Sequence, residues 1–124
     1  MRRLMVSTLF SFVTLPIIFA QNVNSNTVTV KGRVVDSVCA YTLEPSKSVS
    51  SDCAKVSANN GSPLVILRDD GTIFLPIDSK TPGALQNPKL QPYAGQRVSI
   101  RGVDYVRNGS HALVIESITA SERR

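Results

Sequence analysis

Apolar and polar residues alternate along several short stretches of this chain, and a period of two is typical of β-strands with one buried face. The first stretch covers residues 27–34, where valines alternate with threonine, lysine and arginine. Gly32 interrupts the apolar row, which predicts a bend or a close approach of another backbone. A second alternating stretch covers residues 97–103. We therefore predict one strand over each range.

Turn sequences predict two hairpins. A continuous apolar run at 64–67 is typical of a strand buried on both faces. An Asp-Gly pair at 70–71 follows it and predicts a tight turn into a returning strand over 72–77. An Asn-Gly pair at 108–109 predicts a second tight turn, which leads into a last strand over 111–118.

Two segments lack a strand pattern. Residues 40–63 are rich in serine, asparagine and lysine and predict an irregular insertion, with a short helix near 52–58 as one option. Residues 78–95 carry several prolines and predict a loop, with one helical turn around 89–93.

Five strands with this order and spacing favour a small closed barrel, because closure removes exposed sheet edges. A β-sandwich normally has more strands. The predicted fold class is all-β: a small five-stranded barrel like the oligonucleotide/oligosaccharide-binding (OB) barrel. The irregular insertion follows its first strand and is expected to be stapled by a disulfide.

The N-terminal segment has the layout of a secretory signal peptide. Two arginines precede an apolar run over 4–19, and Ala20 is a small residue before the expected cleavage point. An uncleaved membrane anchor is the alternative, but the run is short for a span and carries four hydroxyl residues. We predict a periplasmic or secreted protein without a transmembrane anchor after cleavage. The expected segments are a signal peptide (1–20), a flexible leader (21–26), the barrel domain (27–120) and a polar tail (121–124).

The net charge is mildly positive. The full chain carries 14 lysines and arginines against 9 acidic residues, a formal charge of +5. Removal of the two signal-peptide arginines leaves about +3 on the exported domain. A net charge of this size is only weak support for an anionic partner.

The two cysteines, Cys39 and Cys53, are an even pair in a chain predicted to be exported, and such a pair indicates a disulfide. On the chain-entropy model a bridge over this short loop stabilises the fold by roughly 3 kcal/mol. A metal or redox pair is the alternative, but the spacing is not that of a CxxC motif.

Catalytic and metal-site patterns are missing from the sequence. His111 is the only histidine, and it follows a turn, where an exposed structural role is the simplest interpretation. Ser110 and His111 are neighbours in a predicted strand, so their side chains point to opposite faces and cannot form a nucleophile–base pair. We therefore assign no catalytic residue, no metal and no cofactor.

Basic side chains provide the best binding candidate. Lys31 and Arg33 share one face of the first strand, and Arg97 and Arg101 share the polar face of the fourth. These strands are neighbours in an OB barrel, so the four cations are expected to form one outward patch that attracts an anionic ligand or envelope component. A merely solvated strand face is the simpler alternative. Phe74 is the candidate stacking platform, but one aromatic and an exported location disfavour a nucleic acid.

Five motifs occur in a particular order: Asp-x-x-Cys, Cys-Ala-x-x-Ser, Gly-x-Pro, Asp-Gly and Ala-Gly-x-x-Val-x-x-x-Gly. They lie at residues 36–39, 53–57, 61–63, 70–71 and 94–102. This order resembles a group of small exported bacterial proteins with OB-like barrels, over roughly residues 31–118. The resemblance implies an exported barrel and no established activity. Ser57 stands where the group has a third cysteine, so three-thiol chemistry is not carried over.

The sequence thus predicts a non-enzymatic, exported binding or envelope-accessory module. Two alternatives remain open. One is a binder of anionic carbohydrate or single-stranded nucleic acid through the basic strand face. The other is a redox or metal-handling protein that uses Cys39 and Cys53.

Overall fold

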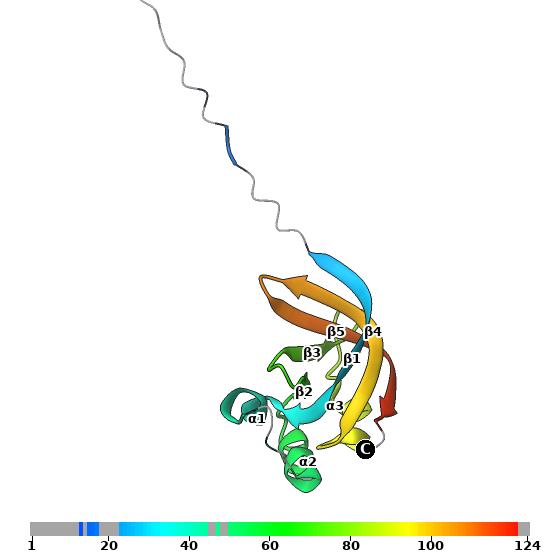
Figure 1. Ribbon diagram of the computed structural model, residues 1–124. Helices are drawn as coiled ribbons and strands as arrows, with labels where there is room; N and C mark the ends of the chain where they lie inside the picture. The colour runs from blue at the N-terminus through cyan, green and yellow to red at the C-terminus, as the bar shows by residue number, and fades with distance from the viewer. Residues whose placement is uncertain (1–12, 14, 18–22, 45–46, 48–49, 122–124) are drawn as a thin grey trace, which may run out of the picture.

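A computed structural model of the protein describes residues 13, 15–17, 23–44, 47 and 50–121. Strands dominate this part of the chain, and short helices connect them (Figure 1). The elements are β1 (Asn24–Asp36), α1 (Ser37–Thr42), α2 (Ser51–Asn59), β2 (Leu64–Leu67), β3 (Ile73–Ile77), α3 (Asn87–Leu90), the 3₁₀ turn η1 (Gln91–Tyr93), β4 (Arg97–Arg107) and β5 (Ser110–Ala120).

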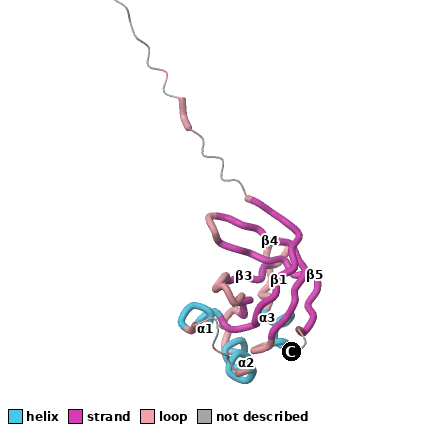
Figure 2. The backbone as a smooth tube through the Cα atoms, in the orientation of Figure 1, coloured by secondary structure: helices cyan, strands magenta, loops and turns pink. Residues whose placement is uncertain are grey.

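The five strands form a closed barrel in the order β1-β2-β3-β5-β4. Only β3 and β5 run parallel, and the other neighbours are antiparallel. The beginning of β1 and the β4–β5 hairpin lie at one end of the molecule, whereas α1 and α2 lie at the other (Figures 1 and 2). The predicted all-β class and the closed five-stranded barrel are confirmed.

Gly32 lies where β1 passes from one neighbour to the next. β1 pairs with β4 up to Arg33 and with β2 from Arg33 to Asp36. A Cβ at Gly32 would lie 2.7 Å from the Ile66 side chain and 2.8 Å from the Leu67 carbonyl oxygen. The prediction of a close backbone approach at this glycine is therefore confirmed. The approach allows β1 to pair with β4 along its first part and with β2 along its last part.

Alternate residues of the strands fill the barrel. The interior cluster contains buried aliphatic side chains from four strands. Small residues of α2 and Leu90 of α3 pack against one end of the barrel and belong to the same cluster. Its strand residues are Val30, Val34, Leu64, Ile66, Phe74, Val98, Ile100 and Leu113. The core is aliphatic except for Phe74, as expected of a chain with few aromatic residues.

The helices match the sequence expectations only in part. The expected helix near 52–58 is α2, and its N-cap is Ser50, whose hydroxyl accepts a hydrogen bond from the Cys53 N–H. α1 was not expected, because its six residues include Val, Cys, Tyr and Thr and have little helical propensity. The Asp36 carboxylate starts this helix by accepting the Cys39 N–H at 2.8 Å. β1 begins at Asn24, so half of the expected leader is strand.

The predicted disulfide is wrong: Cys39 and Cys53 are both free thiols in the structure. Each cysteine is the third residue of its own helix, and an N-cap side chain three residues earlier holds its N–H. The Asp-x-x-Cys motif is therefore a helix start, and this local geometry does not bring the two sulfurs within bonding distance. No disulfide staples the insertion.

The predicted signal peptide lies largely outside the described residues. Of residues 1–20 the structure describes only 13 and 15–17, and these form no helix or strand. Across the described chain, no helix is both long enough and apolar enough to cross a membrane.

Candidate anion-binding face

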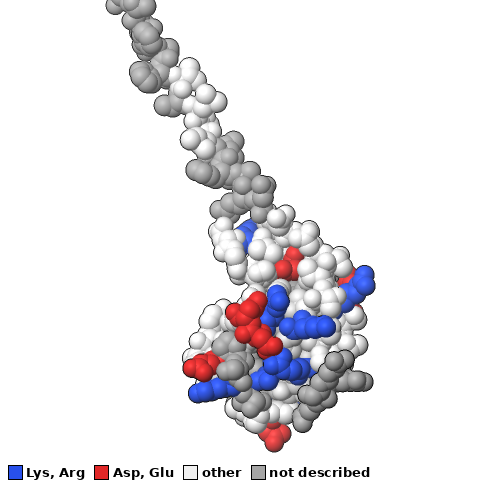
Figure 3. Space-filling model, viewed as in Figure 1, with Lys and Arg blue, Asp and Glu red and all other residues white. Residues whose placement is uncertain are grey.

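The closed barrel brings the four predicted cations onto one outer surface. Arg33 of β1 lies directly opposite Arg97 of β4, and Thr29 lies opposite Arg101. Lys31 lies between these two levels, opposite Ser99. We call Lys31, Arg33, Arg97 and Arg101 the basic face. Figure 3 shows basic side chains gathered over this side of the barrel, with acidic side chains beside them.

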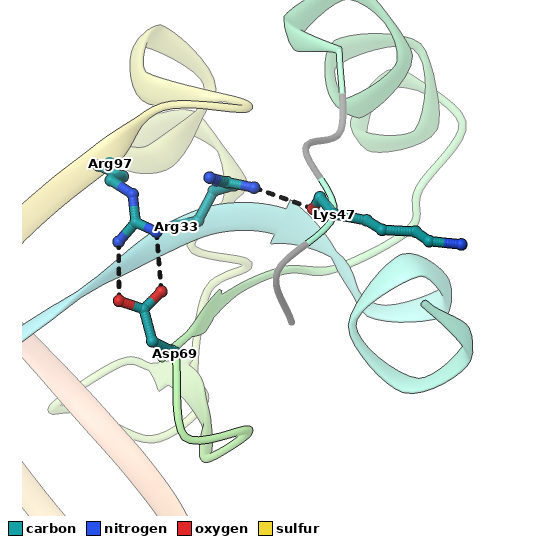
Figure 4. A network of polar contacts seen from close by, with 4 residues as sticks. All are labelled: Arg33, Lys47, Asp69 and Arg97. Carbon is teal, nitrogen blue, oxygen red and sulfur yellow. Dashed lines mark hydrogen bonds and ion pairs between the residues drawn. The ribbon is translucent and has the colours of Figure 1, made fainter. Parts of the chain in front are cut away.

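Arg97 is held by a carboxylate from the β2–β3 turn. Its two terminal nitrogens donate to the two oxygens of Asp69 at 3.1 and 2.8 Å, a bidentate arrangement (Figure 4). These hydrogen bonds, together with the charge of Arg97, hold the pKa of Asp69 below its ordinary value, and they raise the pKa of Arg97. Both side chains are well exposed, so the pair orients Arg97 more than it stabilises the fold.

Among the described residues, Arg33 makes no such pair with a carboxylate. Its Nη1 donates to the backbone carbonyl of Lys47 at 2.9 Å, which directs the guanidinium toward the α1–α2 connection (Figure 4). The charge of Arg33 also lowers the pKa of Asp69. Asp69 therefore offsets the repulsion between two arginines that the strand register forces side by side.

The remaining two cations are less constrained. Arg101 lies 3.7 Å from Glu116 on β5, and both side chains are about half exposed or more. Within the described residues Lys31 is exposed and forms no ion pair. Among the described residues, the four cations have two carboxylate partners, Asp69 and Glu116, so the positive charge of the basic face exceeds the negative charge that pairs with it.

Phe74 does not lie on this surface. The expectation of an exposed stacking platform is wrong, because Phe74 is 3% exposed and belongs to the interior cluster. Its neighbours Ile73 and Leu75 are on the other side of β3, as expected, but that side is the outer one. Leu75 is accordingly 46% exposed.

A partly buried Asp–His pair at the hairpin end of the barrel was missed by the sequence reasoning. Asp104 is 6% exposed and occupies the inward row of β4, and its Oδ2 lies 2.7 Å from Nδ1 of His111 on β5. Its other carboxylate oxygen, Oδ1, is buried without a hydrogen-bond partner among the described residues. The His111 ring packs against Phe74 with 4.7 Å between ring centroids.

A signal for this pair was present in the sequence. Asp104 continues the inward row of Val98, Ile100 and Gly102, and a two-residue turn at 108–109 places it near His111 across the hairpin. His111 also borders an open groove of about 570 Å³ between the two hairpin turns, beside Tyr41 of α1. No cluster of three or more potential metal ligands occurs in the described part of the chain.

A second polar cluster surrounds the start of α1. Burial raises the pKa of Asp36, but hydrogen bonds from Cys39 and Ser57 lower it by more, so the Asp36 pKa lies below its ordinary value. The same contact with Asp36, together with burial, raises the pKa of the Cys39 thiol to about 11. A thiol in this state is a poor nucleophile and a poor metal ligand at neutral pH.

Cys39 is therefore expected to react with iodoacetamide far more slowly than the exposed Cys53. At pH 8 a pKa of about 11 leaves only about 0.1% of Cys39 as thiolate, which is the reactive form. Asp36→Asn keeps an N-cap side chain but removes the negative charge, and it should speed the alkylation of Cys39 about tenfold. Mass spectrometry of time points measures both rates.

The exposed Cys53 serves as the internal control for this experiment. Equal alkylation rates at the two cysteines would contradict the raised pKa of the Cys39 thiol. Resistance of both cysteines until a reductant is added would show that they are bridged after all.

Comparison of the chain with protein-family models, with curated proteins and with solved structures finds no match.

Proposed function

We propose that this protein is an exported, non-enzymatic binding module with an OB-like barrel, and that its basic face binds an anionic carbohydrate. The strand order β1-β2-β3-β5-β4, the parallel β3–β5 pair and the position of α3 between β3 and β4 support the OB assignment. The N-terminal sequence supports export to the periplasm or beyond. The observation that carries the binding proposal is the register that sets Arg33 beside Arg97.

The geometry of the cations favours a carboxylated or sulfated sugar. Arginine presents a planar fork that matches a carboxylate or sulfate bidentately, and Arg97 already holds the Asp69 carboxylate in this way. The Asp69 contact therefore supports a ligand that carries a carboxylate or a similar anionic group. A ligand anion can replace Asp69 on Arg97 and engage Arg33 at the same time, because both guanidinium groups lie next to that carboxylate.

The two alternatives have less support. Binding of single strands needs several stacking platforms, but Phe74 is buried and only Tyr105 is an exposed aromatic on the outward row of β4. A redox or metal-handling role needs an accessible thiolate. Cys39, with its pKa raised to about 11, does not provide one.

Reversal of two charges on the basic face is expected to abolish retention on heparin resin. In Arg33→Glu/Arg101→Glu the face becomes net negative, so a sulfated sugar is repelled instead of attracted. Retention of the original protein should weaken as salt rises through about 0.15 M, where the Debye length is about 8 Å. Thermal unfolding of the double variant should change little, since exposed substitutions usually shift stability by about 0.5 kcal/mol or less.

Lys80→Glu/Arg107→Glu is the matched control, because it changes the net charge equally but away from the basic face. Arg107 lies six residues along β4 from Arg101, a distance of about 20 Å. The control should remain on the resin, and Asp69→Asn should elute at higher salt because it frees Arg97. Loss of retention in the control as well would mean that net charge alone, and no defined face, causes binding.

A further inference from the structure

The first half of β1 has a neighbouring strand on one side only. β1 pairs with β4 from Asn24 to Arg33, but with β2 only from Arg33 to Asp36. Within the described residues, the other side of residues 24–31 is therefore an open sheet edge. It lies at the end of the molecule where β1 begins, away from α1 and α2 (Figure 1).

The hydrogen bonds at Val34 show which backbone groups face this edge. The Val34 N–H donates to the Gln96 carbonyl at 3.0 Å, and the Gly95 N–H donates to the Val34 carbonyl at 2.7 Å. Successive residues of a strand direct these groups to opposite sides, so the even-numbered residues of β1 face β4. The odd-numbered residues from Ser25 to Lys31 direct theirs to the open edge. Within the described chain these backbone groups have no other partner.

Only Lys31, at the far end of this edge, carries the kind of side chain that protects an edge strand from pairing. Charged residues, proline or a β-bulge usually prevent an edge strand from pairing with another chain. Residues 24–30 contain no charged residue and no proline, and their pairing with β4 shows no register shift. Thr27, Val28, Thr29 and Val30 are all β-branched, a composition that favours strand pairing. β5 is also unpaired on one side after Val114, but it carries Glu116 there.

We propose that a second copy of this chain pairs with this edge, antiparallel to the first. An antiparallel pairing centred on Val28 sets Thr27 opposite Thr29 of the second copy and Lys31 opposite Ser25 of the second copy. Threonine pairs across strands are favourable, and the two lysines lie at opposite ends of the pair. A parallel pairing would set Lys31 beside its own copy, where like charges repel. The pairing is isologous and closes at a dimer.

The dimer has a consequence for binding that rests on the proposed function. The odd-numbered side chains of β1 point outward, and the two-fold axis keeps those of both copies on the same side of one continuous sheet. The two basic faces then form one longer surface. A polymeric anion can engage both, and the second contact is made at high effective concentration.

Sedimentation equilibrium of the full protein between about 10 µM and 1 mM tests the dimer without any ligand. The edge is short, so we expect a weak dimer with a Kd on the order of 100 µM. Thr27→Pro removes a backbone N–H that faces the open edge and makes no bond to β4. Thr27→Lys adds a charge of the kind that prevents edge strands from pairing with other chains. Both variants should remain monomeric at 1 mM. The lysine variant keeps the test valid if the proline variant fails to fold.

Thr119→Lys is the matched control, because it adds the same charge to an exposed residue of β5. It should dimerise like the original protein. A protein that stays monomeric up to 1 mM overturns the proposal. So does a dimer that survives Thr27→Lys, or one that Thr119→Lys abolishes, since either result places the interface elsewhere.

Amide hydrogen exchange gives a second readout with residue resolution. At 1 mM, a Kd of about 100 µM leaves about 20% of the chains monomeric, so the amides of Ser25, Thr27 and Thr29 should exchange about fivefold more slowly than in the monomer. The amides of Val28 and Val30 bond to β4 in both states and should not change. Exchange at the odd-numbered positions that is independent of protein concentration would overturn the proposal even if a dimer forms.

Discussion

Replacing Gly102 with alanine is expected to lower the free energy of unfolding by about 3 kcal/mol. Gly102 lies in the inward row of β4, where β5 shifts register next to it. A Cβ there would overlap the carbonyl oxygen of Val114 and press on the Leu113 side chain. Because the obstacle is backbone on a paired strand, no rotamer change can relieve it. Urea denaturation measures the loss.

Gly83→Ala is the matched control. Gly83 lies in the loop after β3, and an added Cβ makes only ordinary contacts at 3.5 Å with Asp78 and Lys80. This variant should be neutral or slightly more stable, by less than about 1 kcal/mol, because alanine reduces the freedom of the unfolded chain. If Gly102→Ala proves as stable as Gly83→Ala, the backbone of β5 at Val114 does not approach Gly102 as closely as in the structure.

Asn87→Ala is expected to cost roughly 2–4 kcal/mol of stability. Asn87 is 5% exposed at the start of α3. Its Oδ1 accepts the Leu64 N–H and its Nδ2 donates to the Ser62 carbonyl, both at 2.8 Å. Alanine leaves the buried Leu64 N–H without a partner at the first residue of β2. Thermal and urea unfolding of the variant measure the effect.

The comparison is Asn59→Ala, the same change at the end of α2. Asn59 accepts a hydrogen bond from Gln91 at 2.6 Å, but that contact is exposed, so water replaces it at little cost. We expect a change of about 0.5 kcal/mol or less. Equal effects at both asparagines would mean that Asn87 does not hold the beginning of β2.

Alternation along the chain predicts strand positions well but not always which face is buried. Over residues 27–34 of β1 and 97–102 of β4, one row is apolar or glycine and the other is polar, so the inward row is unambiguous there. In β3 all five residues, Ile-Phe-Leu-Pro-Ile, are apolar. The pattern therefore says that Phe74 lies opposite its two neighbours but cannot say which side is the interior. The barrel buries the ring that the sequence reasoning expected to be exposed.

The cysteines show a different limit. Their number and the predicted export favoured a bridge, but a disulfide depends on the distance between two sulfurs, which composition does not contain. In the structure the residues around Cys39 and Cys53 start two helices. Asp36 and Ser50 are residue types that favour the N-cap position, but the low helical propensity of residues 37–42 gives no signal for α1.

The strands, the two tight turns, the close approach at Gly32 and the rows of basic residues on β1 and β4 can all be predicted from the sequence. These features depend on neighbours along the chain, through side-chain alternation and turn preferences. The contacts between distant segments appear only in the folded chain: Arg33 lies opposite Arg97, Asp69 pairs with Arg97, and Asp104 is buried against His111. The same holds for the open edge that the first half of β1 leaves among the described residues. Those outcomes depend on how far each strand pairs before the barrel closes, and register between distant strands is set by the packing of the whole core.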